Sequence, residues 1–471
     1  MNRKYKYLAK NVGILTISNF ASKILKFFLV PLYTSILSTE EYGIFDLVNT
    51  TITLLIPLVT LDISEAALRF ALDEKNDKKQ VYSITLIYFF VGSLIVAALL
   101  TFNHIFLWYK PFDEYAVFFL IMFCVNTLNA MVSNFTRGLD KIKEIAISGV
   151  ISSFVCIILN IVFLIPLHMG LKGYFLAYIL GPLAQIVYQI FATKLWRYIG
   201  FRNLDRSTDQ AMRNYSTPLI LNDLGWWINS TSDRYVVIIF CGIAENGIYA
   251  VGSKIPMILR IFQSIFEQAW ILSSVKDFDP EDKDGFFSNL YNIYSFLIVF
   301  ICSVIILFNR PLARFMYAKD FYVAWRYVPF LTVAIVFSAL SGYLGCLFGA
   351  AKDSKFSYLT MIGAIANLIM NIIFVQFIGA LGAALATTIS SWLVWMLRTV
   401  RIKRHIKLKF KMKRDYTAFL VLMIQSLVLL IMPEDTAFVY ILETGLFLMN
   451  IVLYHNEVIH IWQKGKTVLK A

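Results

Sequence analysis

The segment IAISGVISSFVCIILNIVFLIPLH occupies residues 145–168 and contains no Asp, Glu, Lys or Arg. A helix needs about 20 mainly apolar residues to cross the hydrocarbon core of a bilayer. Peptide groups cannot stay unpaired in hydrocarbon, so this segment is expected to cross as a helix. Fourteen such segments follow one another along the chain, of which the seventh is polar in its middle and the thirteenth is short: 11–37, 43–68, 81–107, 115–136, 145–168, 173–195, 214–240, 246–272, 286–309, 323–349, 356–377, 381–400, 416–432 and 436–460.

The composition supports an all-α integral membrane protein. Of 471 residues, 59% are hydrophobic and 15% are charged, whereas soluble domains carry about 25% charged residues. The basic N-terminus runs into the first apolar segment without a small-residue cleavage site, which favours a retained helix over a signal peptide. The net charge is +13, but the basic residues lie between the apolar segments, which favours membrane orientation rather than nucleic-acid binding.

The positions of the basic residues predict which side each connection faces. With the N-terminus in the cytoplasm, and with basic residues at the ends of spans counted with the adjacent connections, 32 of the 43 Lys and Arg residues fall on the inside, 6 on the outside and 5 deeper within spans. Cytoplasmic loops carry the excess of positive charge, so both termini are expected in the cytoplasm of a multi-pass protein of the cell membrane. Four of the six exceptions lie in the connection between the ninth and tenth spans, at Arg310, Arg314, Lys319 and Arg326.

An internal repeat divides the spans into two parallel six-helix bundles. Gly138-Leu-Asp-Lys141 is echoed by Gly349-Ala-Ala-Lys352, and Gly170-Leu-Lys-Gly173 by Gly379-Ala-Leu-Gly382. Glu41-Tyr-Gly43 likewise matches Glu245-Asn-Gly247. Parallel repeats are a transporter architecture with the substrate path between the halves. We therefore expect an N-terminal bundle over 1–205, a second bundle over 206–404, and a basic linker with the last two helices over 405–471.

Two charged segments flank the second bundle. Residues 398–414 hold nine Lys and Arg; this stretch is interpreted as an inside anchor, with binding of anionic lipid headgroups as the alternative. The acidic segment 276–284 is expected to be a solvated loop, because its carboxylates are not spaced as a calcium loop.

Taken in order, a set of short motifs resembles the polysaccharide-transporter branch of the multidrug/oligosaccharidyl-lipid/polysaccharide flippase superfamily, with its MATE-like fold. The motifs are Pro31, Glu41-Tyr42-Gly43-Ile44-Phe45-Asp46, Ala67-Leu68-Arg69-Phe70, Arg137-Gly138-Leu139, Tyr215-Ser-Thr-Pro218-Leu219, Asp233-Arg234-Tyr235 and Gly247-Ile248-Tyr249-Ala250 with Lys254. The resemblance covers nearly the whole chain. It implies export of undecaprenyl-pyrophosphate-linked sugar repeat units for capsule, O-antigen, exopolysaccharide or teichoic-type polymers.

Basic side chains inside the spans are candidate contacts for the substrate's phosphates. Charged residues in spans are costly and point to function. Thr16, Asn19, Lys23 and Lys26 lie along one face of the first helix. Together with Lys254 and Arg260 of the eighth helix, the two lysines are expected to offset the charge of a pyrophosphate in a shared cavity. Further polar cavity contacts, including contacts with sugars, are expected at Asn19, Asn222, Trp226, Asn229 and Gln263.

Carboxylates in the spans are candidates for ion coupling or for pairing with those cations. They are Asp62, Asp223, Asp233 and Glu267. Asp62, Glu65 and Arg69 share a helix face, where Glu65 and Arg69 at i and i+4 could simply pair. Asp233 with the adjacent Arg234 could equally be structural.

The leading interpretation is therefore a flippase for lipid-linked oligosaccharides that works by alternating access with ion coupling. No P-loop or catalytic motif is found, so we expect no enzyme activity, no ATP-driven transport, no cofactor and no metal. The alternatives are a peptidoglycan-precursor (lipid II) flippase, a multidrug cation antiporter, or a membrane glycan polymerase or ligase. Expected partners are the lipid-linked substrate, membrane lipids, and a glycan polymerase with its chain-length machinery.

Overall fold

The computed structural model describes residues 27–202, 204–276, 278–353, 356–432, 436–459 and 463. Within these residues the chain forms helices and no strand. The first unit has α2 (Val30–Ile36), α3 (Thr39–Val59), α4 (Ile63–Leu72), α5 (Lys78–Phe106), α6 (Lys110–Glu114), α7 (Ala116–Gly138), α8 (Ile142–Leu164), α9 (Gly170–Thr193), η1 (Leu195–Tyr198) and most of α10 (Arg206–Cys241). The second unit continues with α11 (Ile243–Gly252), α12 (Met257–Lys276), α13 (Phe286–Leu307), α14 (Asn309–Met316), η2 (Lys319–Arg326), α15 (Val328–Ala350), α16 (Ser357–Ile378), α17 (Ala380–Ile402), α18 (Met412–Ile431) and α19 (Ala437–Leu453).

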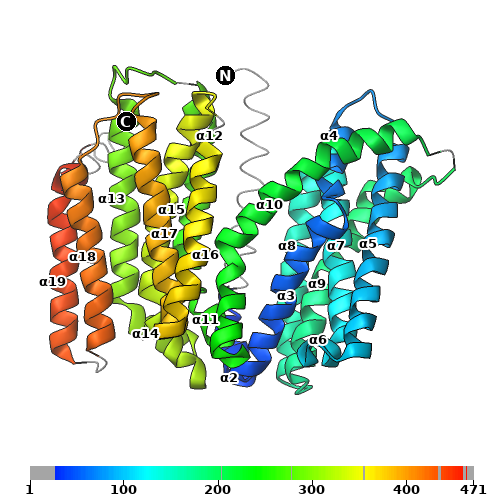
Figure 1. The fold of residues 1–471 in the computed structure, drawn as a ribbon, viewed down its shortest axis with the longest axis horizontal. Coiled ribbons are helices and arrows are strands. Elements are labelled where there is room, and N and C mark those ends of the chain that lie inside the picture. The colour runs from blue at the N-terminus through cyan, green and yellow to red at the C-terminus, as the bar shows by residue number, and fades with distance from the viewer. Residues whose placement is uncertain are drawn as a thin grey trace. The chain divides into compact units, whose positions relative to one another are not determined.

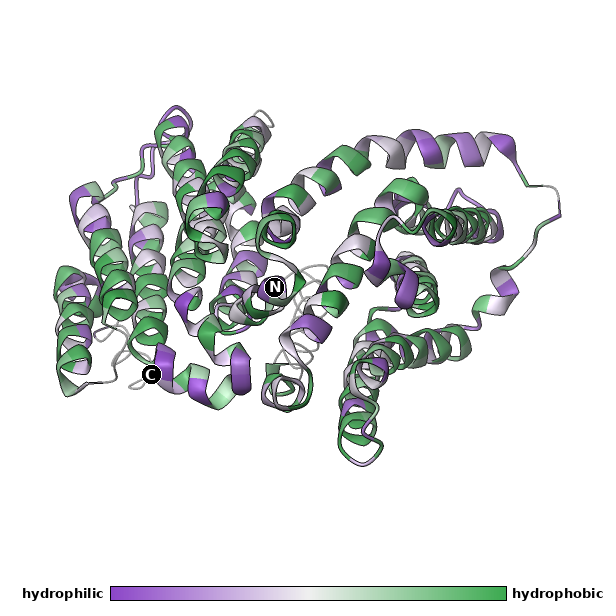
Figure 2. Ribbon diagram, turned by 60° about the horizontal axis from the view of Figure 1, so that its bottom comes forward, coloured by the Kyte–Doolittle hydropathy of each residue, from purple (hydrophilic) through white to green (hydrophobic). Residues whose placement is uncertain are grey.

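Ten helices in the described part of the chain are long and apolar enough to cross a membrane: α3, α5, α7, α8, α9, α13, α15, α16, α17 and α18. Figure 2 shows hydrophobic residues along most of the helix lengths and hydrophilic residues gathered in the loops. An all-α, multi-pass membrane fold is thereby confirmed. The count of fourteen stays a prediction, because most of the first predicted span lies outside the described residues and α10 is too polar to qualify.

Two of the predicted spans are interrupted. The second is divided into α3 and α4, and the eighth is divided into α11 and α12 by a turn at residues 253–256. The helix α11 begins as many residues after the start of α3 as Glu245-Asn-Gly247 lies after Glu41-Tyr-Gly43. The ends of α4 and α12 show the same displacement. The interrupted spans thus occupy equivalent places in the two predicted repeats.

The first unit is a helical bundle in which α8 and α9 pack along each other, and α7 packs against α4, α5 and α9 (Figure 1). Its core is partly aromatic. Tyr174 of α9 contacts Tyr33 of α2 and both Tyr42 and Phe45 of α3. By contrast, only 28% of the apolar stretch of α5 is buried within the protein, which is typical of a lipid-facing helix.

The second unit is built around α15. This helix packs against α12, α13, α17 and α18, and 78% of its apolar stretch is buried, against 28% for α16. Trp270 of α12 stacks on Tyr343 of α15 and donates a hydrogen bond to the Tyr343 carbonyl oxygen at 3.0 Å. A helix that is buried on all sides forms the core of a bundle.

Polar residues fix where several helices begin. Ser38 and Glu41 form a capping box at α3, in which the Glu41 amide donates to Ser38 Oγ at 3.1 Å. Asp205 precedes α10 and accepts hydrogen bonds from the side chains and amides of Ser207 and Thr208. Those bonds lower the pKa of Asp205 to about 2, with the Ser207 hydroxyl as the largest cause.

The acidic segment 276–284 is not simply a solvated loop, so that expectation was partly wrong. Asp282 is 4% exposed and accepts hydrogen bonds from the amides of Phe287 and Ser288 and from the Ser288 hydroxyl. It therefore satisfies amide groups at the start of α13, which have no partner within the helix. Asp279 accepts the amides of Lys283 and Glu281, which lower its pKa.

The basic stretch 398–414 is engaged within the second unit. Arg401 and His405 contact Asp353 at 2.9 and 3.0 Å, and Lys407 contacts Glu281 at 2.6 Å. The interpretation of this stretch as an anchor or a lipid site omitted these internal partners. Arg398 is a buried member of α17 that donates to the Ser341 carbonyl oxygen at 2.7 Å.

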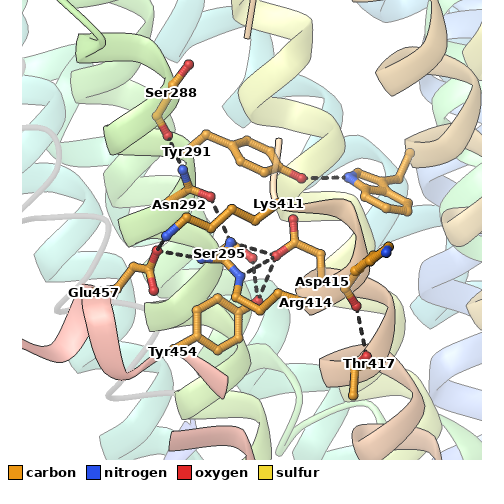
Figure 3. A network of polar contacts seen from close by, with 12 residues as sticks. Ser288, Tyr291, Asn292, Ser295, Lys411, Arg414, Asp415, Thr417, Tyr454 and Glu457 are labelled. Atoms are coloured by element: carbon orange, nitrogen blue, oxygen red, sulfur yellow. Dashed lines mark hydrogen bonds and ion pairs between the residues drawn. The ribbon is translucent and has the colours of Figure 1, made fainter. Parts of the chain in front are cut away.

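The last two helices are joined to α13 by a polar network (Figure 3). Arg414 contacts Asp415 at 2.7 Å and Glu457 at 2.5 Å, and it donates to Asn292 at 2.7 Å. Glu457 also accepts from Lys411 at 2.7 Å, and the Asp415 side chain is fully buried. The network ties α18 and the segment after α19 to the second bundle.

Contacts divide the chain into two compact units, Met1–Thr231 and Ser232–Ala471, with the boundary inside α10. This helix runs without interruption through the place where the predicted seventh span begins. The division into bundles at 205 and 404, with a separate linker and helix pair, stays a prediction.

Candidate functional site

A polar cavity of about 590 Å³ lies within the first unit. Its walls come from the end of α3, the start of α4, the middle of α7 and the part of α10 before residue 232. Three carboxylates line it, at Asp62, Glu65 and Asp223, and the lining residues that belong to the described part of the chain include no Lys or Arg. The described part of the lining is therefore acidic, while the predicted path cations Lys23 and Lys26 lie outside the described residues.

The break between α3 and α4 places Asp62 in this cavity. Pro57 lies near the end of α3, and Leu61 and Asp62 both adopt left-handed backbone conformations, with φ of 51° and 48°. Non-glycine residues rarely adopt this conformation, which costs roughly 1–2 kcal/mol per residue. Gly92 of α5 lies beside the break, where an added Cβ would meet Thr60 Cγ2 at 3.0 Å.

The carboxylate of Asp62 is buried. The residue is 5% exposed, and its Oδ2 atom has no hydrogen-bond partner. Asp62 precedes the first residue of α4, where aspartate side chains commonly cap the helix, yet its side chain makes no capping hydrogen bond. Asp62 thus caps no backbone amide of α4, but its carboxylate does have a side-chain hydrogen bond with Ser64.

Glu65 has a partner other than the predicted one. Its Oε1 accepts a hydrogen bond from Asn134 Nδ2 of α7 at 2.9 Å, and no ion pair with Arg69 is formed. Arg69 is exposed on the opposite side of α4 from the buried residues. The predicted Glu65–Arg69 pair is wrong, because Asn134 of α7 supplies a half-buried amide, whereas the isolated helix would offer only the exposed guanidinium.

The helix α10 contributes a different face from the predicted one. Asp223 and Trp226 line the cavity together with Trp227 and Ser230, which follow at helical spacing. Asn222 is exposed and donates to Asp223 Oδ1 at 3.4 Å, and neither Asn222 nor Asn229 lines the cavity. Of the four predicted residues on this part of α10, two thus lie in the wall and two lie beside it.

Asp233 belongs to the second unit and has a structural partner there. It is 9% exposed and accepts a hydrogen bond from the Tyr249 hydroxyl of α11 at 2.6 Å, while the Arg234 amide donates to its other oxygen. These bonds tie α10 to α11, which agrees with the structural alternative for this residue.

The predicted polar face of the eighth span is present on α12. Gln263 Nε2 donates to Glu267 Oε1 at 2.9 Å. Glu267 rests on Gly342 of α15, where an added Cβ would come within 2.1 Å of its Oε1. Arg260 is exposed, and Lys254 lies in the turn between α11 and α12.

The remaining predicted cations lie outside the described residues. Asn19, Lys23 and Lys26, with Thr16, belong to the part of the chain before residue 27. Their predicted stripe on the first helix therefore stays a prediction.

Sequence reasoning missed the wall supplied by α7. Asn129 Oδ1 is buried without a hydrogen-bond partner and lines the cavity, as do Ser133 and Asn134. The several Asn, Ser and Thr residues of this span were a usable signal, since polar side chains in spans mark paths or contacts. The buried Glu443 of α19, which accepts from Gln425 at 3.1 Å, was missed in the same way.

The helical architecture and the apolar helices define an all-α, multi-pass membrane protein with interrupted spans and a polar cavity. The fold resembles the lipid II flippase MurJ in an inward closed conformation, with a TM-score of 0.71 and 17% identity over 96% of this chain and 99% of that one. It also resembles an inward-facing multidrug resistance MATE family transporter, with a TM-score of 0.65 and 15% identity over 83% of this chain and 95% of that one.

Residues 8–271 match the family of polysaccharide biosynthesis proteins, and the chain belongs to that family. An uncharacterized membrane protein of Methanocaldococcus jannaschii, MJ1375, is 24% identical over 85% of this chain and 99% of its own length. The superfamily and the branch inferred from the motifs are confirmed.

Proposed function

We propose that this protein is a flippase that moves undecaprenyl-pyrophosphate-linked oligosaccharide repeat units across the cytoplasmic membrane for polymer biosynthesis. The observation that carries the proposal is the family match over residues 8–271 on a chain with a transporter fold. The substrate would be handed on to a glycan polymerase and its chain-length machinery. Both termini would face the cytoplasm.

Basic side chains would balance the charge of the pyrophosphate while it crosses the membrane. Lys23, Lys26, Lys254 and Arg260 are the proposed contacts, because a pyrophosphate that loses its hydration must be balanced by positive charge. The exposure of Arg260 on α12 supports this role, since a cation in a span favours a water-filled path over lipid. Asn19, Gln263 and Trp226 would meet the sugars.

An ion gradient would drive the cycle. The candidates for coupling are the cavity carboxylates Asp62 and Asp223 in the first unit and Glu267 in the second. Glu267 and Asp62 lie on equivalent interrupted spans, which supports related roles in the two repeats.

The acidic cavity favours a second candidate function, export of cationic compounds. Three carboxylates and the 60% exposed Trp226 would suit an organic cation better than a pyrophosphate. The fold resemblance to a lipid II flippase favours a third, closely related substrate.

A binding panel separates these candidates. The purified full-length protein would be titrated in detergent with an undecaprenyl-pyrophosphate oligosaccharide, with lipid II and with a lipophilic cation, followed by native mass spectrometry. We expect retention of the oligosaccharide lipid, with weaker binding when Arg260 is changed to Ala. Retention of the cation alone would contradict the proposal and support export of cations.

A further inference from the structure

We propose that a groove at the start of α13 is the docking site of the lysine-rich segment 464–471, which follows α19. The segment lies outside the described residues, whereas the groove belongs to the described part of the second unit. The inference concerns how the chain after α19 is held and not what is transported, so it does not depend on the proposed function.

The groove consists of two adjoining cavities of about 510 and 170 Å³. The larger cavity is lined by one face of α13, whose residues follow one another at spacings of three and four: Phe286, Asn289, Leu290 and Ile293. Asn289 and Ile293 also line the smaller cavity, so the two are continuous. Phe286 is 44% exposed. An exposed apolar face with a polar rim marks a place where another segment packs.

Carboxylates form the rim of this face. Asp279, Asp282 and Asp284 line the larger cavity, and its lining residues in the described part of the chain include no Lys or Arg. Asp282 is occupied by amides at the start of α13. Asp279 keeps its charge, because backbone amides of its own loop, chiefly that of Lys283, lower its pKa. Asp284 is exposed. The groove therefore favours an occupant with positive charge.

A buried acceptor at the other end of the groove favours the same kind of occupant. Glu457 is 5% exposed and lines the smaller cavity together with Asn456 and Asn289. Its Oε1 accepts hydrogen bonds from Lys411 and Arg414 (Figure 3), whereas its Oε2 has no hydrogen-bond partner among the described residues. Buried polar atoms normally have a partner. An occupant that carries ammonium or N–H donors would satisfy this oxygen.

The segment 464–471 matches the groove in charge and in apolar content. Its charged residues are all basic, at Lys464, Lys466 and Lys470, and the last two flank the apolar pair Val468-Leu469. The groove likewise has an apolar face bordered by carboxylates. The resulting ion pairs would be exposed to water and would be weakened by salt.

The chain brings this segment to the groove. Only a few residues separate it from Glu457, which lines the smaller cavity. Phe286 and Ile293 lie roughly 10 Å apart along α13, whereas the segment can reach up to about 28 Å when extended. A tethered segment also has a high effective concentration, so weak contacts suffice. An anionic lipid headgroup is a poorer occupant, because the carboxylates of the rim would repel it.

The test uses the purified protein without its native cysteines, in detergent and in liposomes. The rate at which a maleimide modifies Asn289→Cys measures how well the groove is covered. Three forms are compared: the full chain, the chain with Lys464→Glu, Lys466→Glu and Lys470→Glu together, and a chain that ends at Gln463. Lys403→Cys, at an exposed position just after α17, is the matched control site. Size-exclusion chromatography checks that each form is folded.

In the full chain, Asn289→Cys should react severalfold more slowly than in either altered form, and about 1 M salt should remove the difference. Lys403→Cys should react equally in all three forms. Equal rates for Asn289→Cys in the three forms would overturn the inference. Protection that appears only in liposomes and survives removal of the segment would assign the groove to lipid, which also overturns it. Because no lipid-linked substrate is present, a failure of the flippase proposal would leave these results unchanged.

Discussion

At the scale of single residues, the repeated glycines have assignable roles. Gly170 and Gly379 have positive φ values of 53° and 61° and precede or begin α9 and α17. Gly173 and Gly382 lie three residues later, where an added Cβ would meet Phe163 Cβ at 2.9 Å and the Phe374 carbonyl carbon at 2.4 Å. The motif noticed in the sequence therefore makes the same tight helical hairpin in both repeats.

Changing Gly382 to Ala should lower the stability of the protein. The added Cβ would collide with the backbone of α16, which cannot move aside as a flexible side chain would. Overpacking of this kind typically costs about 1–3 kcal/mol. The thermal unfolding midpoint in detergent measures the effect. Gly349→Ala on α15 is the matched control, because nothing lies within 4 Å of its added Cβ; equal midpoints for the two variants would refute the packing role.

At the scale of elements, the apolar segments predicted the spanning helices well, because a run of about 20 apolar residues has few alternatives in lipid. The interruptions were not predicted. Hydrophobicity continues through Leu61, and a left-handed turn leaves no periodic signal. The local hints were Pro57 before the first break and Pro256 in the second. The wall of the cavity was recovered only in part, since which face of α10 points inward depends on its neighbours.

Replacing Leu61 with Gly should preserve or raise stability. Glycine adopts the left-handed conformation without steric cost, so the substitution removes about 1 kcal/mol of backbone strain at the break. Leu68→Gly within α4 should instead destabilise by about 1 kcal/mol or more. Unfolding midpoints measured side by side check the pair. If Leu61→Gly proved the more damaging of the two, the interruption at that residue would be wrong.

Removing the carboxylate charge of Asp415 should loosen the C-terminal helices. Breaking a buried ion pair by removing one partner typically costs about 3–5 kcal/mol of stability. Because Arg414 keeps its contact with Glu457, the cost of Asp415→Asn should lie near the lower end of that range. The exposed Lys407–Glu281 pair serves as the control, because such pairs contribute about 0–1 kcal/mol. Limited proteolysis between α17 and α18 should speed up for Asp415→Asn and not for Glu281→Gln; the same rate for both would speak against the network as an anchor.

At the scale of the whole molecule, the charge pattern predicts both termini in the cytoplasm. Arg310 explains one exception to that pattern. It is buried in the second unit, donates to the Leu429 carbonyl oxygen at 2.6 Å and to that of Met432, and lies over the Trp325 ring at 4.7 Å. It thus satisfies carbonyl groups at the end of α18, so its place reflects packing and not orientation.

Cysteine labelling checks the orientation. Single cysteines placed at Lys75 and Lys319, in a background without the native cysteines, should differ in their reaction with a membrane-impermeant maleimide in whole cells. The residue in the external connection, Lys319, should react, and Lys75 should react only after the membrane is opened. The reverse pattern would invert the topology.

The substrate path is the feature that the sequence predicted least completely. The family was identifiable from ordered motifs. The lining of the cavity was harder to predict, because it depends on which helix faces meet; its described residues include three carboxylates. The central claim is that the protein moves a lipid-linked oligosaccharide with cations along its path.

The most direct test of this claim is a flipping assay in proteoliposomes with a fluorescent undecaprenyl-pyrophosphate oligosaccharide. Flipping is measured as protection of the fluorophore from an external quencher, under an imposed pH or sodium gradient. The native protein should flip the lipid and respond to one of the gradients. Lys23→Ala and Arg260→Ala should both slow flipping while inserting normally, and Lys23→Arg should retain more activity than Lys23→Gln. Absence of flipping by the native protein, or undiminished flipping by both neutral variants, would contradict the account.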